Sequence, residues 1–120
     1  MKTETITQKC SNSGIKYIQD ALEVLNGSWK LPILASLSEG TKRFKEIAKD
    51  VDGISDKMLS KELRSLEMNR LVKRTVYDTF PPAVEYSVTE HTATLRDVLN
   101  ALSNWGFTHR QKIIGKAYAK

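Results

Sequence analysis

Residues 55–69 read SDKMLSKELRSLEMN, and the leucines in this stretch recur at the spacing of one helix face. Leu59, Leu63 and Leu66 stand at i, i+4 and i+7, which places them on a single side of an α-helix. Ser55 precedes the periodic residues and is a typical N-cap. Polar and basic side chains fall largely on the other side: Lys57, Ser60, Lys61 and Arg64. The stretch therefore predicts a helix with an apolar back and a basic front.

The basic front has two readings, a solvated surface or a face that meets a polyanion. The preceding residues favour the second. Apolar residues from Phe44 to Val51 predict a short helix over about residues 44–50, and Asp52-Gly53 is a turn signal. Two short helices joined by a glycine-containing turn, the second of them basic, form the helix-turn-helix pattern of DNA-binding proteins.

A β-hairpin is predicted directly after this pair of helices. Residues 71–77 (LVKRTVY) and 83–89 (AVEYSVT) are rich in β-branched and aromatic residues with partial alternation. Residues 78–82 (DTFPP) contain two prolines, which cannot donate to a strand ladder and so mark the hairpin tip. The fold class is therefore mainly α with a small β-hairpin, a winged helix-turn-helix in which the tip reaches along the duplex.

Further helices are predicted on both sides of this unit. Residues 14–26 form an amphipathic helix closed by Asn26-Gly27, and Ser28 can cap an apolar helix over 29–37. Residues 91–112 are predicted to form one long helix. A single small domain cannot bury the apolar stripes of both outer helices, so a homodimer is expected. The candidate interface residues are Ile15, Ile18, Leu22, Leu99, Leu102 and Trp105.

Composition and charge limit the function classes. The chain of 120 residues suits one domain, and its formal net charge of +5 suits a nucleic-acid partner. We expect a flexible arm over residues 1–13, the winged domain over 14–112 and a basic tail over 113–120. The chain shows neither a signal-peptide pattern nor a run that could span a membrane, so we expect a cytoplasmic protein.

Catalysis and metal binding have no sequence support. One cysteine and two histidines argue against a disulfide framework and a zinc site, and no cofactor is expected. The sequence contains no nucleophile–base motif and no Gly-rich phosphate loop, so an enzyme is not expected. The remaining alternative is a winged helix that binds other proteins. The surfaces of such proteins usually carry exposed apolar residues in place of charged ones.

The motifs together resemble a known family, the HxlR-type winged-helix transcriptional regulators of bacteria and archaea, which are relatives of the MarR group. The resemblance covers about residues 10–107 in order. It is carried by seven segments: 27–30 (GSWK), 43–47 (RFKEI), 53–60 (GISDKMLS), 62–67 (ELRSLE), 71–77, 81–89 and 95–106. It implies a dimer, built from the N- and C-terminal helices, that binds operator DNA and represses or activates transcription.

The resemblance also implies roles for individual residues. The groove-facing candidates are Ser55, Lys57, Ser60, Lys61 and Arg64. Arg43 would approach the DNA backbone, and Arg74 and the tip around Thr79 would form the wing contact. Lys57, Lys61 and Arg64 suit phosphates, while Ser60 and Arg64 can also bond to base edges.

Cys10 is a candidate redox sensor by the same resemblance. Some family members sense oxidants or electrophiles through a cysteine before the first helix, and Cys10 lies close to that position, so it is either a sensor or an inert thiol. Aromatic residues between subunits can line a pocket for a small-molecule effector. A glycine is common in the family where Arg70 stands, and Asn69 is expected to take the left-handed turn instead.

Overall fold

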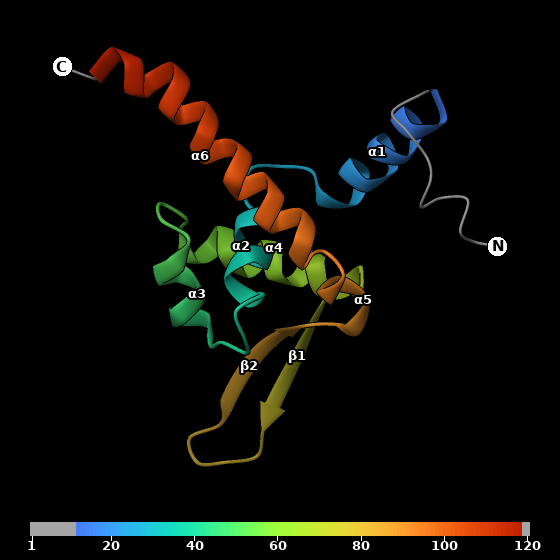
Figure 1. Cartoon of the computed structure of the whole chain (residues 1–120). Coiled ribbons are helices and arrows are strands. Elements are labelled where there is room, and N and C mark those ends of the chain that lie inside the picture. Colours follow the sequence, from blue (N-terminus) through green and yellow to red (C-terminus); the bar gives the residue numbers. More distant parts are fainter. Residues whose placement is uncertain (1–11, 119–120) are drawn as a thin grey trace.

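The computed structural model describes residues 12–118, with side chains placed for residues 14–113. The described chain consists of helices and one two-stranded hairpin, which confirms the expected fold class (Figure 1). The elements in order are α1 (Asn12–Leu25), α2 (Lys30–Leu37), α3 (Phe44–Asp50), α4 (Asp56–Met68), β1 (Val72–Tyr77), β2 (Ala83–Val88), α5 (Glu90–Ala93) and α6 (Arg96–Tyr118).

The core lies where α2, α3 and α4 meet the base of the hairpin. Leu59, Leu63 and Leu66 of α4 are at most 1% exposed, as their helical spacing predicts. The apolar helix α2 supplies Ile33, Leu34 and Leu37, and the rest of the buried cluster is Ile47, Val51, Leu71 and Val72. Burial of these side chains is the main source of stability in the body. It also fixes the opposite, polar face of α4 towards solvent.

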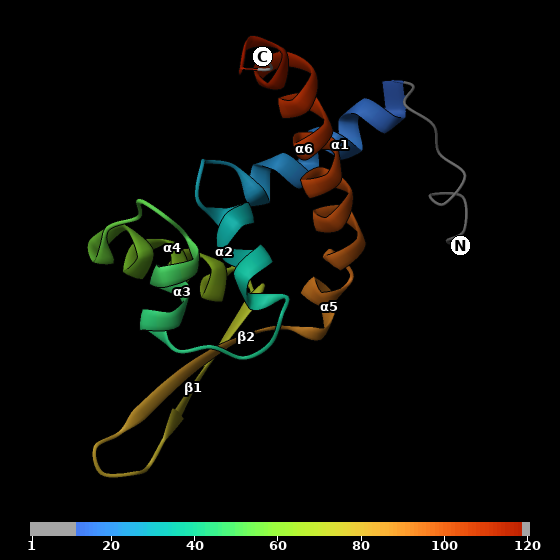
Figure 2. The same cartoon turned by 60° about the vertical axis from the view of Figure 1, so that its left-hand side comes forward.

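The hairpin projects from this body on the side away from α1 and α6 (Figures 1 and 2). Its antiparallel register runs from Val72 opposite Val88 to Tyr77 opposite Ala83. The turn therefore occupies residues 78–82, where the two prolines predict it. Each strand is one residue shorter than predicted, because β1 begins at residue 72 rather than 71 and β2 ends at residue 88 rather than 89.

Helices α1 and α6 extend from the body rather than packing into it. In both views they lie on the side opposite the hairpin (Figures 1 and 2). Leu25 at the end of α1 and Leu99 near the start of α6 pack against the core. The other large apolar side chains that the structure places on these two helices, up to residue 113, are largely exposed.

The predicted helix over 91–112 differs from the structure at both ends. Thr89 begins a separate short helix, because its hydroxyl oxygen accepts a hydrogen bond from the Thr92 N–H at 3.3 Å. The Thr94 hydroxyl donates to the His91 carbonyl at 2.6 Å, and α6 begins only after this interruption. At the other end α6 continues to Tyr118, so the boundary expected at residue 112 falls within a helix.

Two expected helix caps are also different. Trp29, rather than Ser28, is the N-cap of α2, and no side chain caps that helix. At the end of α4, Arg70 has φ 62°, whereas Asn69 has φ −88°, so the expectation for Asn69 was wrong. Leu71 N–H donates to the Leu66 carbonyl at 2.9 Å and Arg70 N–H to the Glu67 carbonyl at 3.0 Å. This pair of bonds is the Schellman arrangement, which requires the left-handed residue at position 70.

Candidate nucleic-acid interface

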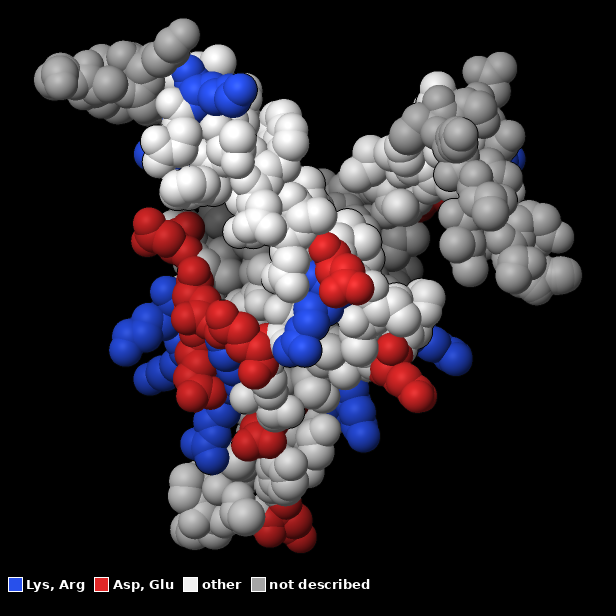
Figure 3. All heavy atoms as spheres, in the orientation of Figure 1, with Lys and Arg blue, Asp and Glu red and all other residues white. Residues whose placement is uncertain are grey.

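The polar face of α4 is the centre of the candidate interface. Every basic or hydroxyl residue that the sequence analysis assigned to this face is exposed: Lys57, Ser60, Lys61 and Arg64. Further Lys and Arg side chains extend from the left-hand edge of the body, around α3, beside acidic side chains on its front (Figure 3). A helix of 13 residues with this face free can enter a major groove.

Ser55 has a structural role at the start of α4. Its side-chain oxygen accepts a hydrogen bond from the Met58 N–H at 3.1 Å, as the N-cap prediction requires. The hydroxyl proton remains available for donation, so the cap does not exclude a phosphate contact. Gly53, with φ +88°, completes the turn between α3 and α4.

An ion pair that the sequence did not reveal anchors the back of α4. Lys30 Nζ lies 2.6 Å from Glu62 Oε1, and the two side chains are 12% and 15% exposed. Their separation of 32 residues gave no local signal. The pair joins α2 to α4 and so helps to set the orientation of the exposed face.

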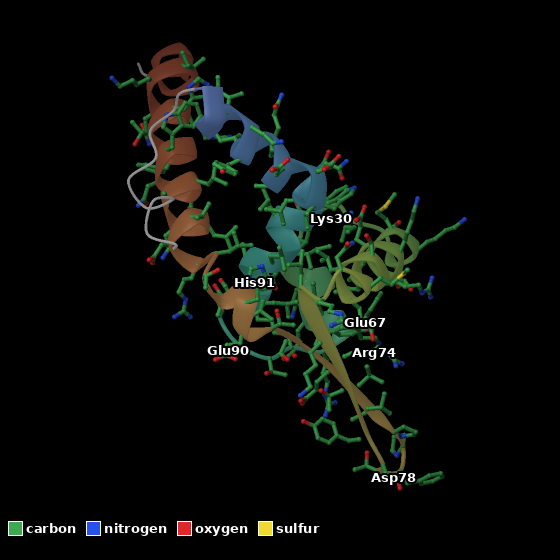
Figure 4. All side chains as sticks on the ribbon, turned by 90° about the vertical axis from the view of Figure 1, so that its right-hand side faces the viewer. Lys30, Glu67, Arg74, Asp78, Glu90 and His91 are labelled. Carbon is green, nitrogen blue, oxygen red and sulfur yellow. The ribbon has the colours of Figure 1, made fainter. Side chains whose placement is uncertain are left out.

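A polar hollow of about 360 Å³ lies between α4 and the hairpin. Ser60, Arg64 and Glu67 line it from α4, Arg74 from β1 and Tyr86 from β2. Figure 4 shows Glu67 and Arg74 beside each other where the hairpin leaves the body. The structure thus brings together Ser60, Arg64 and Arg74, three predicted DNA-contact residues from two separate elements.

Two of the predicted contact residues, Arg43 and Thr79, lie away from both the polar face of α4 and the hollow. Arg43 is exposed at the N-cap of α3, where its backbone N–H donates to Glu46 Oε1 at 2.7 Å. Its side chain is therefore available for a duplex that lies across α3. The Thr79 hydroxyl donates to the Pro81 carbonyl at 2.8 Å, so it braces the hairpin tip. This bond was not foreseen.

A second polar cluster links the turn before α3 to the end of that helix. Lys42 Nζ contacts Glu39 Oε1 at 2.9 Å and also forms an ion pair with Asp50. These hydrogen bonds, first the one to Asp50, raise the pKa of Lys42 above 10.5. The same ammonium, followed by the Ser36 hydroxyl, lowers the pKa of Asp50 below 3.8. The cluster holds the helix-turn-helix together rather than facing the groove.

The candidate dimer residues fall into two groups. Ile15, Ile18 and Leu22 on α1, with Leu102 and Trp105 on α6, are between 48% and 65% exposed. Leu99 instead packs against the core, which separates it from the other five. The Trp105 ring stacks on His109, with centroids 4.9 Å apart. Cys10 lies outside the described residues.

The fold and this face define a DNA-binding transcriptional regulator of the winged-helix class. The chain belongs to the HxlR-like helix-turn-helix family, because a model of that family matches residues 24–113. It is 36% identical over 102 residues to the HTH-type transcriptional regulator YtcD of Bacillus subtilis. The aligned region covers 85% of this chain and 81% of YtcD. The family and the similar proteins are regulators rather than enzymes.

Solved structures of similar proteins agree with this assignment. The redox regulator HypR in its reduced form superposes with a TM-score of 0.74 at 33% identity, covering 85% of this chain and 99% of HypR. The reduced transcriptional regulator YodB from B. subtilis gives a TM-score of 0.66 at 35% identity, covering 79% of this chain and 90% of YodB.

None of the helices within residues 12–118 combines the length and apolar character needed to cross a bilayer.

Proposed function

We propose that the protein is a homodimeric repressor that binds a two-fold symmetric operator, with α4 of each subunit in the major groove. One observation carries the proposal: the exposed polar row of α4 meets Arg74 of the wing around one hollow. A face with this geometry can bond to base edges and also neutralise the neighbouring phosphates. A regulator that binds operator DNA must share a compartment with that DNA, so we expect the protein in the cytoplasm.

The dimer is supported by apolar surface that the protomer leaves open. Residues on one face of α1 and on α6 remain about half exposed, although the same helices contribute Leu25 and Leu99 to the core. In Figure 3 the visible part of α6 is mostly uncharged. A second copy that covers these faces would bury them and present two α4 helices to two half-sites.

Selection of binding sites from a random duplex pool tests the proposal, followed by affinity measurements over a salt series. We expect enrichment of a symmetric site whose half-sites lie one or two helical turns apart, with affinity that falls steeply as salt rises. Salt-sensitive binding without an enriched motif would indicate a non-specific DNA binder. No binding would leave the protein-docking winged helix as the better explanation.

Redox control through Cys10 is a second proposal, supported by the similarity to HypR, which is named a redox regulator. Lys9 precedes this cysteine in the chain, and a neighbouring cation favours the reactive thiolate. We expect peroxide or a quinone to change operator affinity in the wild type and not in Cys10→Ser. An equal response in both proteins would contradict the proposal.

A small-molecule effector is supported by a second hollow, of about 340 Å³, between α2, β2 and the start of α6. Leu34, Leu37 and Leu99 line it, and Arg96 borders it while donating to the Ser38 carbonyl at 2.7 Å. An apolar floor with a guanidinium at its edge suits an aromatic carboxylate. Benzoate should raise the melting temperature of the wild type more than that of Arg96→Gln, and equal shifts would contradict this site.

A further inference from the structure

The far end of the hairpin is apolar and unusually exposed. Phe80 is 101% exposed, and Val76 and Tyr77 are 54% and 44% exposed. Pro81 and Pro82 are exposed as well. An aromatic ring held entirely in water adds nothing to the stability of the fold, and five apolar residues together at one tip form a contact surface rather than a scattered background.

The tip is also braced, so Phe80 is presented in a defined place. The last strand pair, Tyr77 opposite Ala83, closes the turn on one side. Within the turn, the Thr79 hydroxyl donates to the Pro81 carbonyl at 2.8 Å. The Glu85 side chain on the paired strand raises the pKa of Tyr77 above its ordinary value. A surface organised before binding loses less conformational entropy when it meets a partner.

The chemistry of the tip differs from that of a phosphate-binding wing. Residues 78–82 contain no lysine or arginine, and their one charged residue is Asp78. The basic residues of the hairpin, Lys73 and Arg74, lie on β1 closer to the body. Phosphate contact therefore belongs to the base of the hairpin, and the tip needs an apolar partner.

The position of the tip identifies that partner as the base stack of DNA, reached through the minor groove. Arg74 lies beside α4, and Asp78 marks the far end of the hairpin (Figure 4). The strand from Arg74 to Tyr77 advances about 10 Å, and the turn extends beyond it. On one face of B-DNA the minor groove lies about half a helical turn, roughly 17 Å, from the major groove. With α4 in the major groove and Arg74 at the intervening phosphates, Phe80 reaches the neighbouring minor groove.

We propose that Phe80 is an apolar wedge that enters the minor groove outside each half-site and partly unstacks one base step. This inference rests on the proposed DNA-binding function. Phe is among the residues that proteins insert between base steps from the minor groove. Pyrimidine–purine steps such as TA and CA/TG unstack most easily, so the wing selects such a step through its deformability, without a hydrogen bond to its bases.

The test compares Phe80→Ala, Phe80→Leu and Arg74→Ala on the selected operator, with the flanking sequence randomised and affinity measured over a salt series. Phe80→Ala should weaken binding about ten-fold at every salt concentration, because it removes an apolar contact and no charge. Phe80→Leu, which keeps a wedge, should retain most of the affinity. Arg74→Ala should instead lower the salt slope by about one.

Two further readouts separate a wedge from a general loss of affinity. The wild type should enrich a TA or CA/TG step at a fixed distance outside the half-site, and Phe80→Ala should not. A 2-aminopurine placed at that step should brighten when the wild type binds and stay dark with Phe80→Ala. Wild-type affinity and an unchanged flank preference in Phe80→Ala would overturn the wedge and leave a protein partner as the occupant of the tip. Failure of the wild type to bind any duplex would overturn the DNA-binding proposal as well.

Discussion

Lys42 and Tyr86 exchange both of their backbone hydrogen bonds. Lys42 N–H donates to the Tyr86 carbonyl at 3.0 Å, and Tyr86 N–H donates to the Lys42 carbonyl at 2.8 Å. The loop before α3 thus adds an antiparallel bridge to the outer edge of β2. Because Tyr86 pairs with Arg74 on its other side, this bridge sets the wing relative to the helix-turn-helix.

The side chain of Lys42 strengthens the same junction through Asp50, so stability should depend on pH. The pKa of Asp50 is lowered below 3.8, first by the hydrogen bond from Lys42 and then by that from Ser36. A lowered carboxyl pKa stabilises the folded state above 3.8, and this contribution is lost as pH falls through the folded-state pKa. Asp50→Asn should therefore lower the melting temperature at pH 7, and its difference from the wild type should shrink as pH falls below the ordinary aspartate range of about 4.

Asp52→Asn is the control for that measurement, because it removes an exposed acid from the adjacent turn while leaving the Lys42–Asp50 pair intact. It should leave the melting temperature almost unchanged at pH 7. A deficit in Asp50→Asn that stays constant over the acid range would show that the ion pair is not its cause.

The turn after α4 carries a residue that is poorly suited to its backbone. Arg70 has φ 62°, a conformation that costs a residue with a Cβ about 1–2 kcal/mol. Arg70→Gly should remove this cost, and part of the gain is offset by the greater freedom of glycine in the unfolded chain. We expect a net stabilisation of about 0.5–1 kcal/mol in urea unfolding. Asn69→Gly, at φ −88°, should give no such gain, and stabilisation by both variants would contradict the assignment.

Local sequence patterns predicted most of this fold, because its helices, caps and turns depend on residues that are close together in the chain. The leucines of α4 gave its buried face, Ser55 gave its cap, and the prolines of residues 78–82 gave the hairpin tip. The turn at Arg70 was missed because asparagine tolerates the left-handed region better than arginine does, whereas the Schellman bonds leave no choice of position.

The site was predicted less completely, since its geometry depends on contacts between distant residues. The sequence named Arg64 and Arg74, and it could not show that they line one hollow with Tyr86. The Lys30–Glu62 pair joins residues that no local pattern connects. The amphipathic pattern of α6 likewise could not distinguish Leu99, which packs on the core, from Trp105, which is exposed.

Arg64 and Arg74 should act on the same phosphate region. Each single change to alanine should weaken binding to operator and to random duplex alike and reduce the salt slope by about one. The losses of the double variant should be less than additive if both guanidinium groups contact one phosphate. A loss of about 1–3 kcal/mol by Arg64→Ala on the operator alone would instead identify a base contact.

Trp105 should contribute to assembly and little to the protomer's own stability. Its side chain is 65% exposed, so Trp105→Ala removes no buried core contact. We expect a weaker dimer in sedimentation equilibrium, with retained helical content. Met68→Ala is the control, since Met68 is 78% exposed on α4 rather than α6. A fully dimeric Trp105→Ala protein would remove this residue from the interface.

Removing one partner of the Lys30–Glu62 pair should lower the free energy of unfolding more than replacing both partners with apolar residues. Both side chains are largely buried, with 12% and 15% exposure, and their charged atoms are 2.6 Å apart. Removing one partner leaves the other charge buried without compensation, so Lys30→Met and Glu62→Leu should each destabilise the protein by about 2–4 kcal/mol. The double variant replaces the pair with apolar groups and should recover much of that loss. Urea unfolding of all four proteins measures the coupling. If the double variant loses the sum of the two single losses, the pair does not act as a unit in joining α2 to α4.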